Sequence, residues 1–317
     1  MTTITRSGSL APNADQLPDV LPTERLFASG KAKPGVLPDL RMIDDRPNAL
    51  SVTGVYVQMF GSWALAGYVS HPLMWAAMFI WSTRCIAMLG ILNHEAAHAL
   101  LFSNRRLNDA VARYFMAPLV FSDFDAYRHG HLAHHKEELG PDEPDVSLYA
   151  PYPSGNRIWR RLARDLFGVS ASKLLRAIAR SKRSIRHRVL IAQVSLFPLA
   201  WLLTGYWWGW LMVWFLPWAT VHQVNNRLRA IAEHAGMKAG ADRRVTTHVV
   251  DQSLAAGFML APFKTGYHLA HHVDTSVPWR NLDTLNRELE AAGWITPEMR
   301  HRNYRALWHY LATGVRR

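Results

Sequence analysis

Two long stretches of this chain contain no charged residue. Neither Asp, Glu, Lys nor Arg occurs in residues 47–83 or in residues 189–226. Each stretch is nearly twice the roughly 20 apolar residues that cross a bilayer as a helix. Turn residues interrupt both near the middle, at Ser70-His71-Pro72 and Thr204-Gly205-Tyr206. The pattern predicts an all-α fold with two membrane hairpins, and its four spans are expected at residues 50–70, 72–93, 189–204 and 206–226.

The alternative is a soluble protein with four unusually apolar, buried helices. Aromatic residues favour the membrane interpretation, because Tyr206, Trp207, Trp208 and Trp210 gather at the second turn. Such rings are enriched where a membrane meets water. One residue is costly in this picture: Arg84 falls inside the second span and must pair, snorkel or face the interior of the bundle.

A basic segment sets the expected orientation. Between Arg157 and Arg188 there are eleven Lys or Arg and one acid, Asp165, which is most of the formal net charge of +12. Seven of these bases directly precede the third span, so the segment should be cytoplasmic. Two hairpins then place both chain ends in the cytoplasm. Next to a span, such a surface more often meets anionic lipid than nucleic acid, so no nucleic-acid partner is expected.

The expected organisation has two parts. Residues 1–46 contain no apolar signal-peptide core and are predicted to be a polar cytoplasmic tail. Residues 47–317 form the membrane domain, whose cytoplasmic helical cap comprises residues 94–188 and 227–317. The single cysteine, Cys85, excludes a disulfide framework and a cysteine-ligated zinc site.

A first pair of histidines stands at the end of the second predicted span. His94 and His98 are four residues apart, so both imidazoles face the same side of a helix and can bind one metal or two adjacent ones. The segment His94-Glu95-Ala96-Ala97-His98 also fits the zinc metalloprotease motif, in which the Glu is the general base. On this motif alone the two interpretations are equally favoured.

Two histidine triplets share a second spacing. Each has histidines at i, i+3 and i+4 with Leu-Ala between the first two, and they consist of His131, His134 and His135, and of His268, His271 and His272. With 1.5 Å of rise per residue, the helix from Pro72 to His94 is about 33 Å long, enough to emerge on the cytoplasmic side. The triplets lie in the cytoplasmic loop and tail, and His234 projects beyond the fourth span. All these histidines can therefore meet on one side of the membrane.

The number of histidines discriminates between kinds of metal site. Eight fall in motifs and His234 is a plausible ninth, whereas one tetrahedral zinc needs three or four protein ligands. Two ions with four or five imidazoles each would use the whole set. Imidazole suits iron, zinc, copper or nickel, and spacing does not choose among them.

The three histidine motifs resemble those of the membrane fatty acid desaturase and hydroxylase superfamily, the histidine-box di-iron enzymes. His94 to His98, His131 to His135 and His268 to His272 match the family's H-x(3,4)-H, H-x(2,3)-H-H and [HQ]-x(2,3)-H-H in order. The resemblance spans roughly residues 50–290 and includes Tyr127-Arg128 and the segment from Val277 to Leu282. His234 fits the further histidine that related enzymes place after the fourth span. Some acyl-CoA desaturases have an Asn four residues before that histidine, whereas this chain has Ala230. At this position the chain departs from that subgroup.

The resemblance implies a di-iron, O2-dependent oxidoreductase, with a fatty acid desaturase as the first expectation. The implied iron ligands are nine histidines: His94, His98, His131, His134, His135, His234, His268, His271 and His272. Two reduced irons would bind and split O2, and the resulting oxidant would remove hydrogen from a lipid chain. No His-Pro-Gly-Gly of a fused cytochrome b5 occurs, so a separate ferredoxin, rubredoxin or cytochrome should supply electrons. The basic loop could dock that donor or contact lipid.

Several alternatives stay open. The same site could serve a lipid, alkane or sphingoid hydroxylase or a carotenoid ketolase, while a membrane zinc protease and a histidine-rich metal carrier belong to other classes. Asp142 and Asp145 follow the second motif and are candidates for orienting a ligand histidine. Beyond the metal site, no catalytic residue is predicted.

Overall fold

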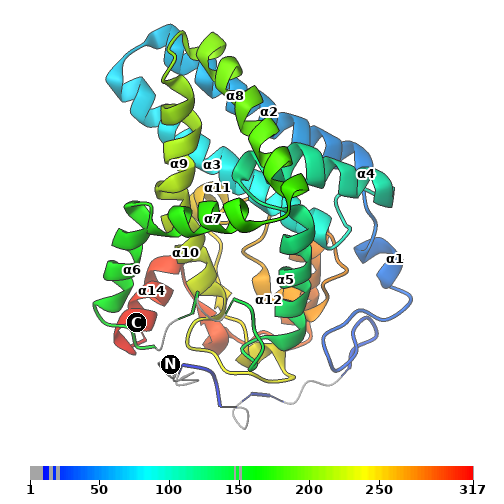
Figure 1. Cartoon of the computed structure of the whole chain (residues 1–317). Coiled ribbons are helices and arrows are strands. Elements are labelled where there is room, and N and C mark those ends of the chain that lie inside the picture. Colours follow the sequence, from blue (N-terminus) through cyan, green and yellow to red (C-terminus); the bar gives the residue numbers. More distant parts are fainter. Residues whose placement is uncertain (1–9, 14–16, 19–21, 146–147, 150–151, 317) are drawn as a thin grey trace. The chain divides into compact units, whose positions relative to one another are not determined.

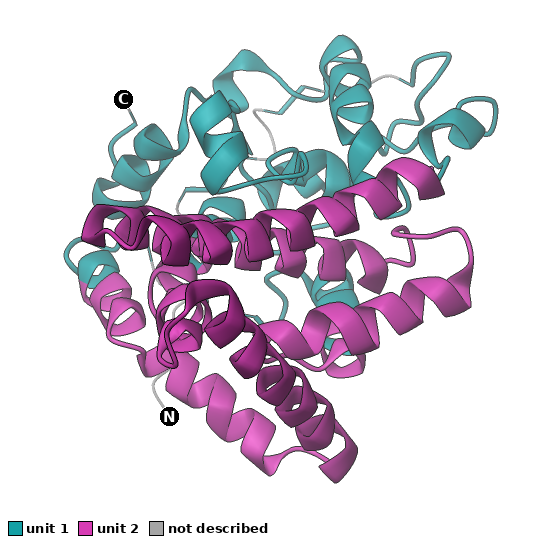
Figure 2. Ribbon diagram, turned by 90° about the horizontal axis from the view of Figure 1, so that it is seen from above, with its two compact units in different colours: residues 1–43, 129–159, 227–317 teal, residues 44–128, 160–226 magenta. Residues whose placement is uncertain are grey.

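The computed structural model describes residues 10–13, 17–18, 22–145, 148–149 and 152–316. Its regular structure is almost entirely helical (Figure 1), as the sequence predicts. The chain divides into two compact units, shown in Figure 2. Unit 1 comprises residues 1–43, 129–159 and 227–317, and unit 2 comprises residues 44–128 and 160–226. The tail predicted for residues 1–46 lies partly outside the described residues.

Unit 2 contains the long apolar helices. Its elements are α2 (Asp45–Val69), α3 (Pro72–Ala97), α4 (Arg105–Ala110), the π-helix η2 (Val111–Met116), the 3-10 helix η3 (Ala117–Val120), α7 (Val169–Arg180), α8 (Arg183–Thr204), the π-helix η4 (Leu211–Phe215) and α9 (Leu216–Ala219). The boundary between the units falls inside three further helices, which are α5 (Phe124–Glu137), α6 (Arg157–Leu166) and α10 (Val221–His234).

The first predicted hairpin is present as α2 and α3, which pack against each other. α2 ends at Ser70, whose φ of 48° is left-handed and stops the helix. Pro72 then begins α3, a position where its missing N–H costs nothing. His71 caps the new helix, because its Nδ1 accepts a hydrogen bond from the Leu73 N–H at 3.2 Å. Each residue of the predicted turn therefore has a role: Ser70 ends α2, His71 caps α3 and Pro72 begins it.

The second predicted hairpin is less regular. α8 ends at Gly205, with φ of 76°, as expected for a glycine that terminates a helix. The returning segment is divided into η4, α9 and the start of α10, and Thr220 between the last two has φ of −121° and ψ of −90°. Pro217 lies in the first turn of α9 and lacks an N–H for regular helix bonding. The expected fourth span is thus a broken helix.

The turns of the two hairpins lie at the same end of unit 2. The Ser70 and Tyr206 hydroxyls are 2.6 Å apart, in hydrogen-bond contact. The ring of Trp75 packs on that of Trp208, with centroids 4.7 Å apart. A Cβ on Gly67 would lie only 2.4 Å from the Thr204 carbonyl oxygen, so glycine is required where α2 crosses α8. The aromatic cluster predicted at the second turn belongs to this end.

Among the described helices, α3 and α8 are long and apolar enough to cross a membrane. The first carries Arg84, the costly residue identified in the sequence. Its Nη1 donates to Gln58 Oε1 of α2 at 2.6 Å, and its guanidinium lies 5.4 Å from the ring centroid of Trp81. The sequence left three possibilities for Arg84: to pair, to snorkel or to face the bundle interior. In the structure it pairs with a side chain of the neighbouring helix α2.

Unit 1 consists of shorter elements around its own core. They are α1 (Leu37–Leu40), the 3-10 helices η5 (Arg243–Val245), η6 (Trp279–Asn281) and η7 (Pro297–Met299), α11 (Leu254–Met259), α12 (His268–Val273), α13 (Leu282–Ala291), α14 (Tyr304–Thr313) and two short strands, β1 (Val249–Val250) and β2 (Arg300–His301). The strands pair in parallel, with Val249 opposite Arg300.

The packing of α12 explains why its histidines share one face. Leu269, Ala270 and Val273 are buried in the hydrophobic core, together with leucines of α13. At 3.6 residues per turn these three positions occupy one side of the helix. The three histidines, His268, His271 and His272, occupy the other. Burial of the apolar side therefore fixes where the imidazoles point.

Candidate metal centre

Unit 1 contains seven of the nine predicted ligands, on α12 and on the parts of α5 and α10 that belong to this unit. α5 contributes His131, His134 and His135, α10 ends at His234, and α12 contributes the third triplet. The rings of His135 and His272 have centroids 4.2 Å apart, and those of His134 and His234 are 4.8 Å apart. Segments that are far apart in the sequence therefore meet in one buried imidazole cluster.

Within this cluster, three histidines form a first group. The Nε2 atom of His135 lies 3.0 Å from that of His131 and 3.1 Å from that of His271. A ring nitrogen of each of the three lies within 4.8 Å of one in both others. The group therefore presents three possible ligand atoms around a common point.

Four histidines form a second group. Ring nitrogens of His134, His234 and His272 lie within 4.8 Å of one another, and all three side chains are buried. The Nε2 atom of His268 lies 2.9 Å from that of His234, which adds a fourth imidazole. The two groups of histidines are adjacent, since His135 and His272 pack together.

The short distances between nitrogens fit a metal centre. Imidazole nitrogens bind a first-row metal such as zinc at about 2.0–2.1 Å, which sets two ligands on one ion roughly 3 Å apart at right angles. The Nε2 pairs around His135 and His234 have this separation. His272 adds a direct sign, because its buried Nε2 has no hydrogen-bond partner within the described structure. A buried unpaired nitrogen is costly unless it binds something.

The opposite nitrogens of three imidazoles have hydrogen-bond acceptors, and that of a fourth lies near a carboxylate. His134 Nδ1 donates to Glu143 Oε1 at 2.8 Å, and His234 Nδ1 donates to the Thr246 carbonyl at 2.9 Å. His272 Nδ1 donates to Glu138, and His268 Nδ1 lies 3.6 Å from Glu233 Oε1. Metal-binding histidines usually donate the second ring N–H to a carboxylate or carbonyl in this way, which fixes the tautomer. These acceptors leave Nε2 as the lone-pair nitrogen.

Burial dominates the electrostatics of the cluster. It lowers the pKa of His234, His268 and His272 well below the usual value, so these rings are neutral and able to ligate at neutral pH. His134 differs. Burial lowers its pKa, but the hydrogen bond and charge of Glu143, aided by Asp145 and Glu138, outweigh this effect and the net pKa is raised.

Glu138 is held by three partners. It accepts hydrogen bonds from His272 and from the Thr246 hydroxyl, and the Arg243 Nη1 lies 2.8 Å from its Oε2. Burial raises the pKa of this carboxyl, and the bond from Thr246 and the charge of Arg243 oppose the rise. Glu138 therefore links α5, α12 and the segment around Thr246.

Sequence reasoning missed both Glu138 and Glu143. It selected Asp142 and Asp145, but Asp142 is exposed. Asp145 has a carboxylate oxygen within 4.8 Å of the ligand atoms of His134 and Glu143. Glu143, between them, binds His134 and accepts from the backbone N–H groups of Leu139 and Asp145. A usable signal existed for Glu138, which follows His134 and His135 by four and three residues.

The remaining two predicted ligands belong to unit 2. His94 is in the last turn of α3 and His98 follows that helix directly, and their ring centroids are 4.9 Å apart. Arg128 holds this helix end, since it donates to the carbonyls of Ala96 and Ala97. The expected i, i+4 pairing of the two imidazoles is therefore present within unit 2.

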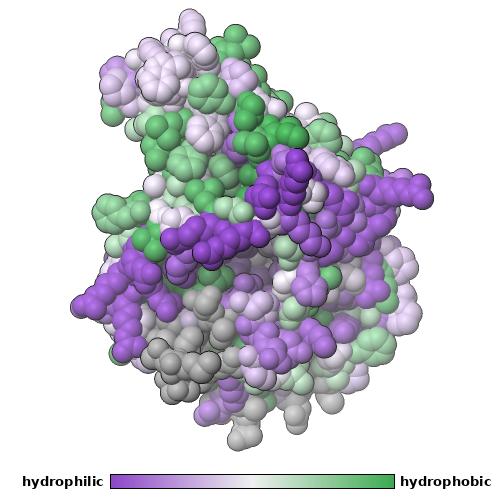
Figure 3. Space-filling model, viewed as in Figure 1, coloured by the Kyte–Doolittle hydropathy of each residue, from purple (hydrophilic) through white to green (hydrophobic). Residues whose placement is uncertain are grey.

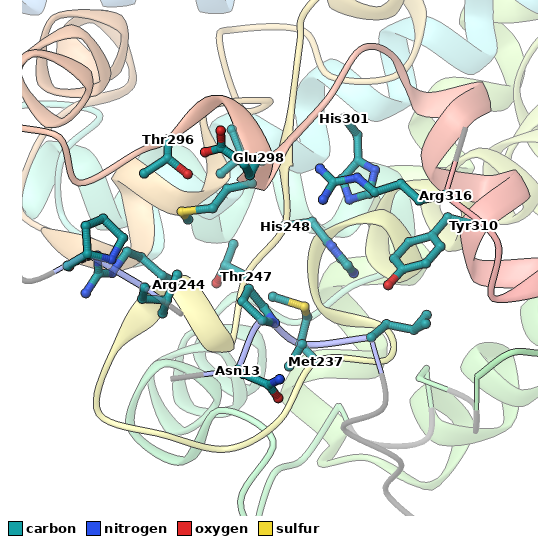
Figure 4. Close-up of a pocket in the computed structure, with 17 residues that line it drawn as sticks. Asn13, Met237, Arg244, Thr247, His248, Thr296, Glu298, His301, Tyr310 and Arg316 are labelled. Atoms are coloured by element: carbon teal, nitrogen blue, oxygen red, sulfur yellow. Dashed lines mark hydrogen bonds between the residues drawn. The ribbon is translucent and has the colours of Figure 1, made fainter. Parts of the chain in front are cut away.

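A separate cavity of 680 Å³ in unit 1 contains two further histidines, His248 and His301 (Figure 4). Their rings are 5.4 Å apart, and Tyr310 and Arg316 also line the cavity. Burial is the main cause that lowers the pKa of His248 to about 4 and that of His301 to about 3. His248 donates through its backbone N–H to the Glu233 carbonyl and through Nε2 to the Ala235 carbonyl. It thus fixes the backbone on both sides of His234.

Comparison with known proteins agrees with this arrangement. The fatty acid desaturase family model matches residues 59–311. The chain is 24% identical to the sn-1 oleoyl-lipid 12-desaturase of Anabaena variabilis, over 70% of this chain and 69% of that protein. It is 25% identical to the sn-1 oleoyl-lipid 12-desaturase of Synechocystis sp., over 69% and 68%, and 25% identical to the dihydrorhizobitoxine desaturase of Bradyrhizobium elkanii, over 60% of each. The resemblance found in the histidine motifs is confirmed: the chain belongs to the fatty acid desaturase family, and so to the oxidoreductases.

Proposed function

We propose that this protein is a membrane fatty acid desaturase that uses O2 and a di-iron centre to introduce a C=C bond into an acyl chain of a lipid or thioester. One observation carries the proposal. Buried imidazoles from three helices direct Nε2 atoms toward one another, while three of them donate Nδ1–H to a Glu carboxylate or to a backbone carbonyl. Family membership supports iron as the metal and desaturation as the reaction.

All nine predicted histidines form the proposed ligand set. The two groups in unit 1 supply three and four imidazoles, which favours two ions over one. His94 and His98 complete the set in this proposal, because their pairing on α3 supplies the two imidazoles that the count still needs. A single zinc ion with three protein ligands would leave most of the buried imidazoles without a role.

The acidic residues of unit 1 prepare the site for the metal. When bound, two reduced irons supply the activation of O2 that hydrogen removal from an unactivated carbon requires. Glu143 and Glu138 hold His134 and His272 in the Nδ1–H tautomer, and the Thr246 carbonyl does the same for His234. Because the two carboxylates are buried and each accepts from several donors, the rings that they hold are oriented before any ion arrives.

The proposed setting is a membrane with four spans near residues 50–70, 72–93, 189–204 and 206–226. The hydrogen-bonded turns at Ser70 and Tyr206 support it, since two membrane hairpins should have their turns on the same side. Residues 94–188 and 227–317 then form a cytoplasmic cap, and both chain ends are cytoplasmic. Electrons come from a separate ferredoxin, rubredoxin or cytochrome with its reductase.

The substrate class follows from chemistry and relatives together. Two relatives are named as oleoyl-lipid 12-desaturases, which supports an acyl chain as substrate. Lipid-facing helices would admit such a chain from the bilayer.

The test is lipid analysis of cells that express the chain with a general ferredoxin and reductase. Total lipids are profiled by mass spectrometry for the wild type, for His134→Ala, and for a control, His187→Ala, whose imidazole is exposed on α8. We expect a product lighter by two hydrogens in the wild type and control and its absence in His134→Ala. A product heavier by one oxygen would instead identify a hydroxylase. Zinc in place of iron with no lipid difference would overturn the proposal.

A further inference from the structure

Helices α6 and α7 combine many basic residues with large exposed apolar side chains. The exposed bases include Arg160, Arg164, Lys173, Arg176 and Arg180. On the same two helices and the link between them, Trp159 is 68% exposed, Leu166 46%, Phe167 82% and Leu174 44%. Soluble surfaces rarely concentrate such side chains without a partner.

The two kinds of residue are arranged along helix faces. Trp159, Ala163 and Leu166 stand at i, i+4 and i+7 of α6, so they form one exposed stripe. Arg160 and Arg164 flank that stripe one position further along. Ile158 and Asp165 are buried and lie on a neighbouring face of α6. The Asp165 carboxylate accepts a hydrogen bond from the Ser170 hydroxyl. α6 is therefore amphipathic with an apolar stripe that its own fold leaves uncovered.

The same surface leads into a candidate membrane span. Ser181 ends α7 in an extended conformation, so the chain changes direction and α7 runs crosswise to α8 (Figure 1). The two helices pack together within unit 2. Early in α8 the exposed residues change from basic, at Arg183 and Arg186, to apolar, at Leu190 and Val194. Figure 3 shows hydrophilic surface over α7 bordering the hydrophobic surface of α8.

We propose that α6 and α7 lie in the interface of an anionic bilayer, with Trp159, Leu166 and Phe167 among the lipid headgroups and chains and the arginines on lipid phosphates. This inference rests on the membrane setting proposed above. Basic amphipathic helices with bulky apolar residues bind membrane surfaces in this way. Long arginine side chains can reach the headgroups while their stems cover apolar surface.

An acidic electron donor is the competing occupant. It would use the positive charge, but a salt-sensitive encounter of that kind has no need of four exposed apolar side chains. Continuity with the apolar face of α8 also favours lipid, because a bilayer that surrounds Leu190 and Val194 would have its charged surface beside Arg183 and Arg186. The charge and the apolar stripe then have one common partner.

The experiment places a spin label at Phe167→Cys in the full chain reconstituted into lipid nanodiscs. Cys85 is fully buried, so the unmodified chain serves as the labelling blank. A matched control is Val315→Cys, an apolar position that is 58% exposed and lies near the C-terminal end. Collision of each label with O2, which partitions into lipid, and with a water-soluble nickel chelate is measured in phosphatidylcholine discs with and without phosphatidylglycerol.

We expect the Phe167 label to collide several-fold less with nickel, and more with O2, than the Val315 label in the anionic discs. Replacing Arg160, Arg164, Arg176 and Arg180 by Gln should move the Phe167 label toward the behaviour of the control. Equal nickel collision at both positions in every disc would overturn the inference. So would protection of Phe167 that appears only when an acidic ferredoxin is added. Desaturase activity, measured on the same samples, reports separately on the proposed function.

Discussion

Arg128 and Asp109 form a two-point ion pair in unit 2, with Nη2 2.5 Å from Oδ1 and Nη1 2.9 Å from Oδ2. The same guanidinium donates to the carbonyls of Ala96 and Ala97 at the end of α3. Arg128 therefore ties three segments together, and it does so directly beside His98.

Asp109→Asn should lower the free energy of unfolding by about 1–3 kcal/mol, because a hydrogen-bonded charge partner of Arg128 is lost. The bond from Arg128 is the main cause that lowers the pKa of Asp109 to about 2. A depressed carboxyl pKa stabilises the folded state above the unfolded pKa and loses that effect as pH falls toward 2. Thermal unfolding in detergent checks the loss. Arg105→Gln, which removes a more exposed partner at 3.4 Å, is the control and should shift the midpoint less.

Glu143→Gln should weaken metal retention roughly 10–100-fold, the usual cost of removing a residue that orients a metal-binding histidine. The two carboxylate oxygens of Glu143 accept from His134 Nδ1–H and from the Leu139 N–H. The Gln side chain has an NH2 group in place of one of these oxygens, so one of the two donors loses its acceptor. The measurement is iron bound per chain after dialysis against increasing chelator. Asp142→Asn removes a neighbouring but exposed carboxylate and should match the wild type. Equal loss in both variants would contradict a specific role for Glu143.

His301→Phe should reduce the sensitivity of the fold to acid. The folded pKa of His301 is about 3, lowered by burial first and then by His248 and Arg316. An unfolded histidine titrates near 6.5, so the unfolded chain binds the extra proton and stability falls as pH drops from about 6.5 toward 3. At about pH 5 this one group costs about 1–2 kcal/mol. The variant should show a smaller fall in unfolding midpoint between about pH 7.5 and pH 5 than the wild type and than His187→Gln.

His271→Ala should abolish lipid desaturation, because it removes one of three imidazoles in the first group of the cluster. A protease built on His94, Glu95 and His98 predicts the opposite sensitivity: Glu95→Gln would eliminate activity and His271→Ala would be tolerated. Lipid profiles and peptide hydrolysis measured for both variants distinguish the two enzymes. Hydrolysis that persists in His271→Ala and disappears in Glu95→Gln would restore the protease interpretation.

The sequence predicted those parts of the fold that depend on neighbouring residues. The turns at Ser70 and Gly205 were identifiable because proline, glycine and uncharged runs act locally. The break at Thr220 and the π-helix from Leu211 to Phe215 were not, because such irregularities depend on packing against other helices. Among the described helices, α3 and α8 stand out as candidate membrane spans. The helix at the first expected span, α2, is continuous but does not pass the same test, and the expected fourth span is divided.

The histidines were visible in the sequence, whereas which acceptor each of them would meet was not. Spacing at i, i+3 and i+4 reveals which imidazoles share a helix face, and α12 follows that rule. Pairing of His272 with Glu138, or of His234 with the Thr246 carbonyl, joins segments that only tertiary structure brings together. Choosing Asp142 over Glu143 illustrates the limit, because a difference of one position in a loop decides which carboxylate is buried.

The division of the chain also determines when the cluster can assemble during synthesis. Histidines of α5 emerge from the ribosome before residues 160–226, which belong to unit 2, whereas His234 and α12 emerge after them. The second hairpin must therefore be made before the second histidine triplet can meet the third. Contacts over such sequence separations are slow to form. Until then His134 and its neighbours lack most of their partners, so we expect metal to be acquired only after α12 has been synthesised.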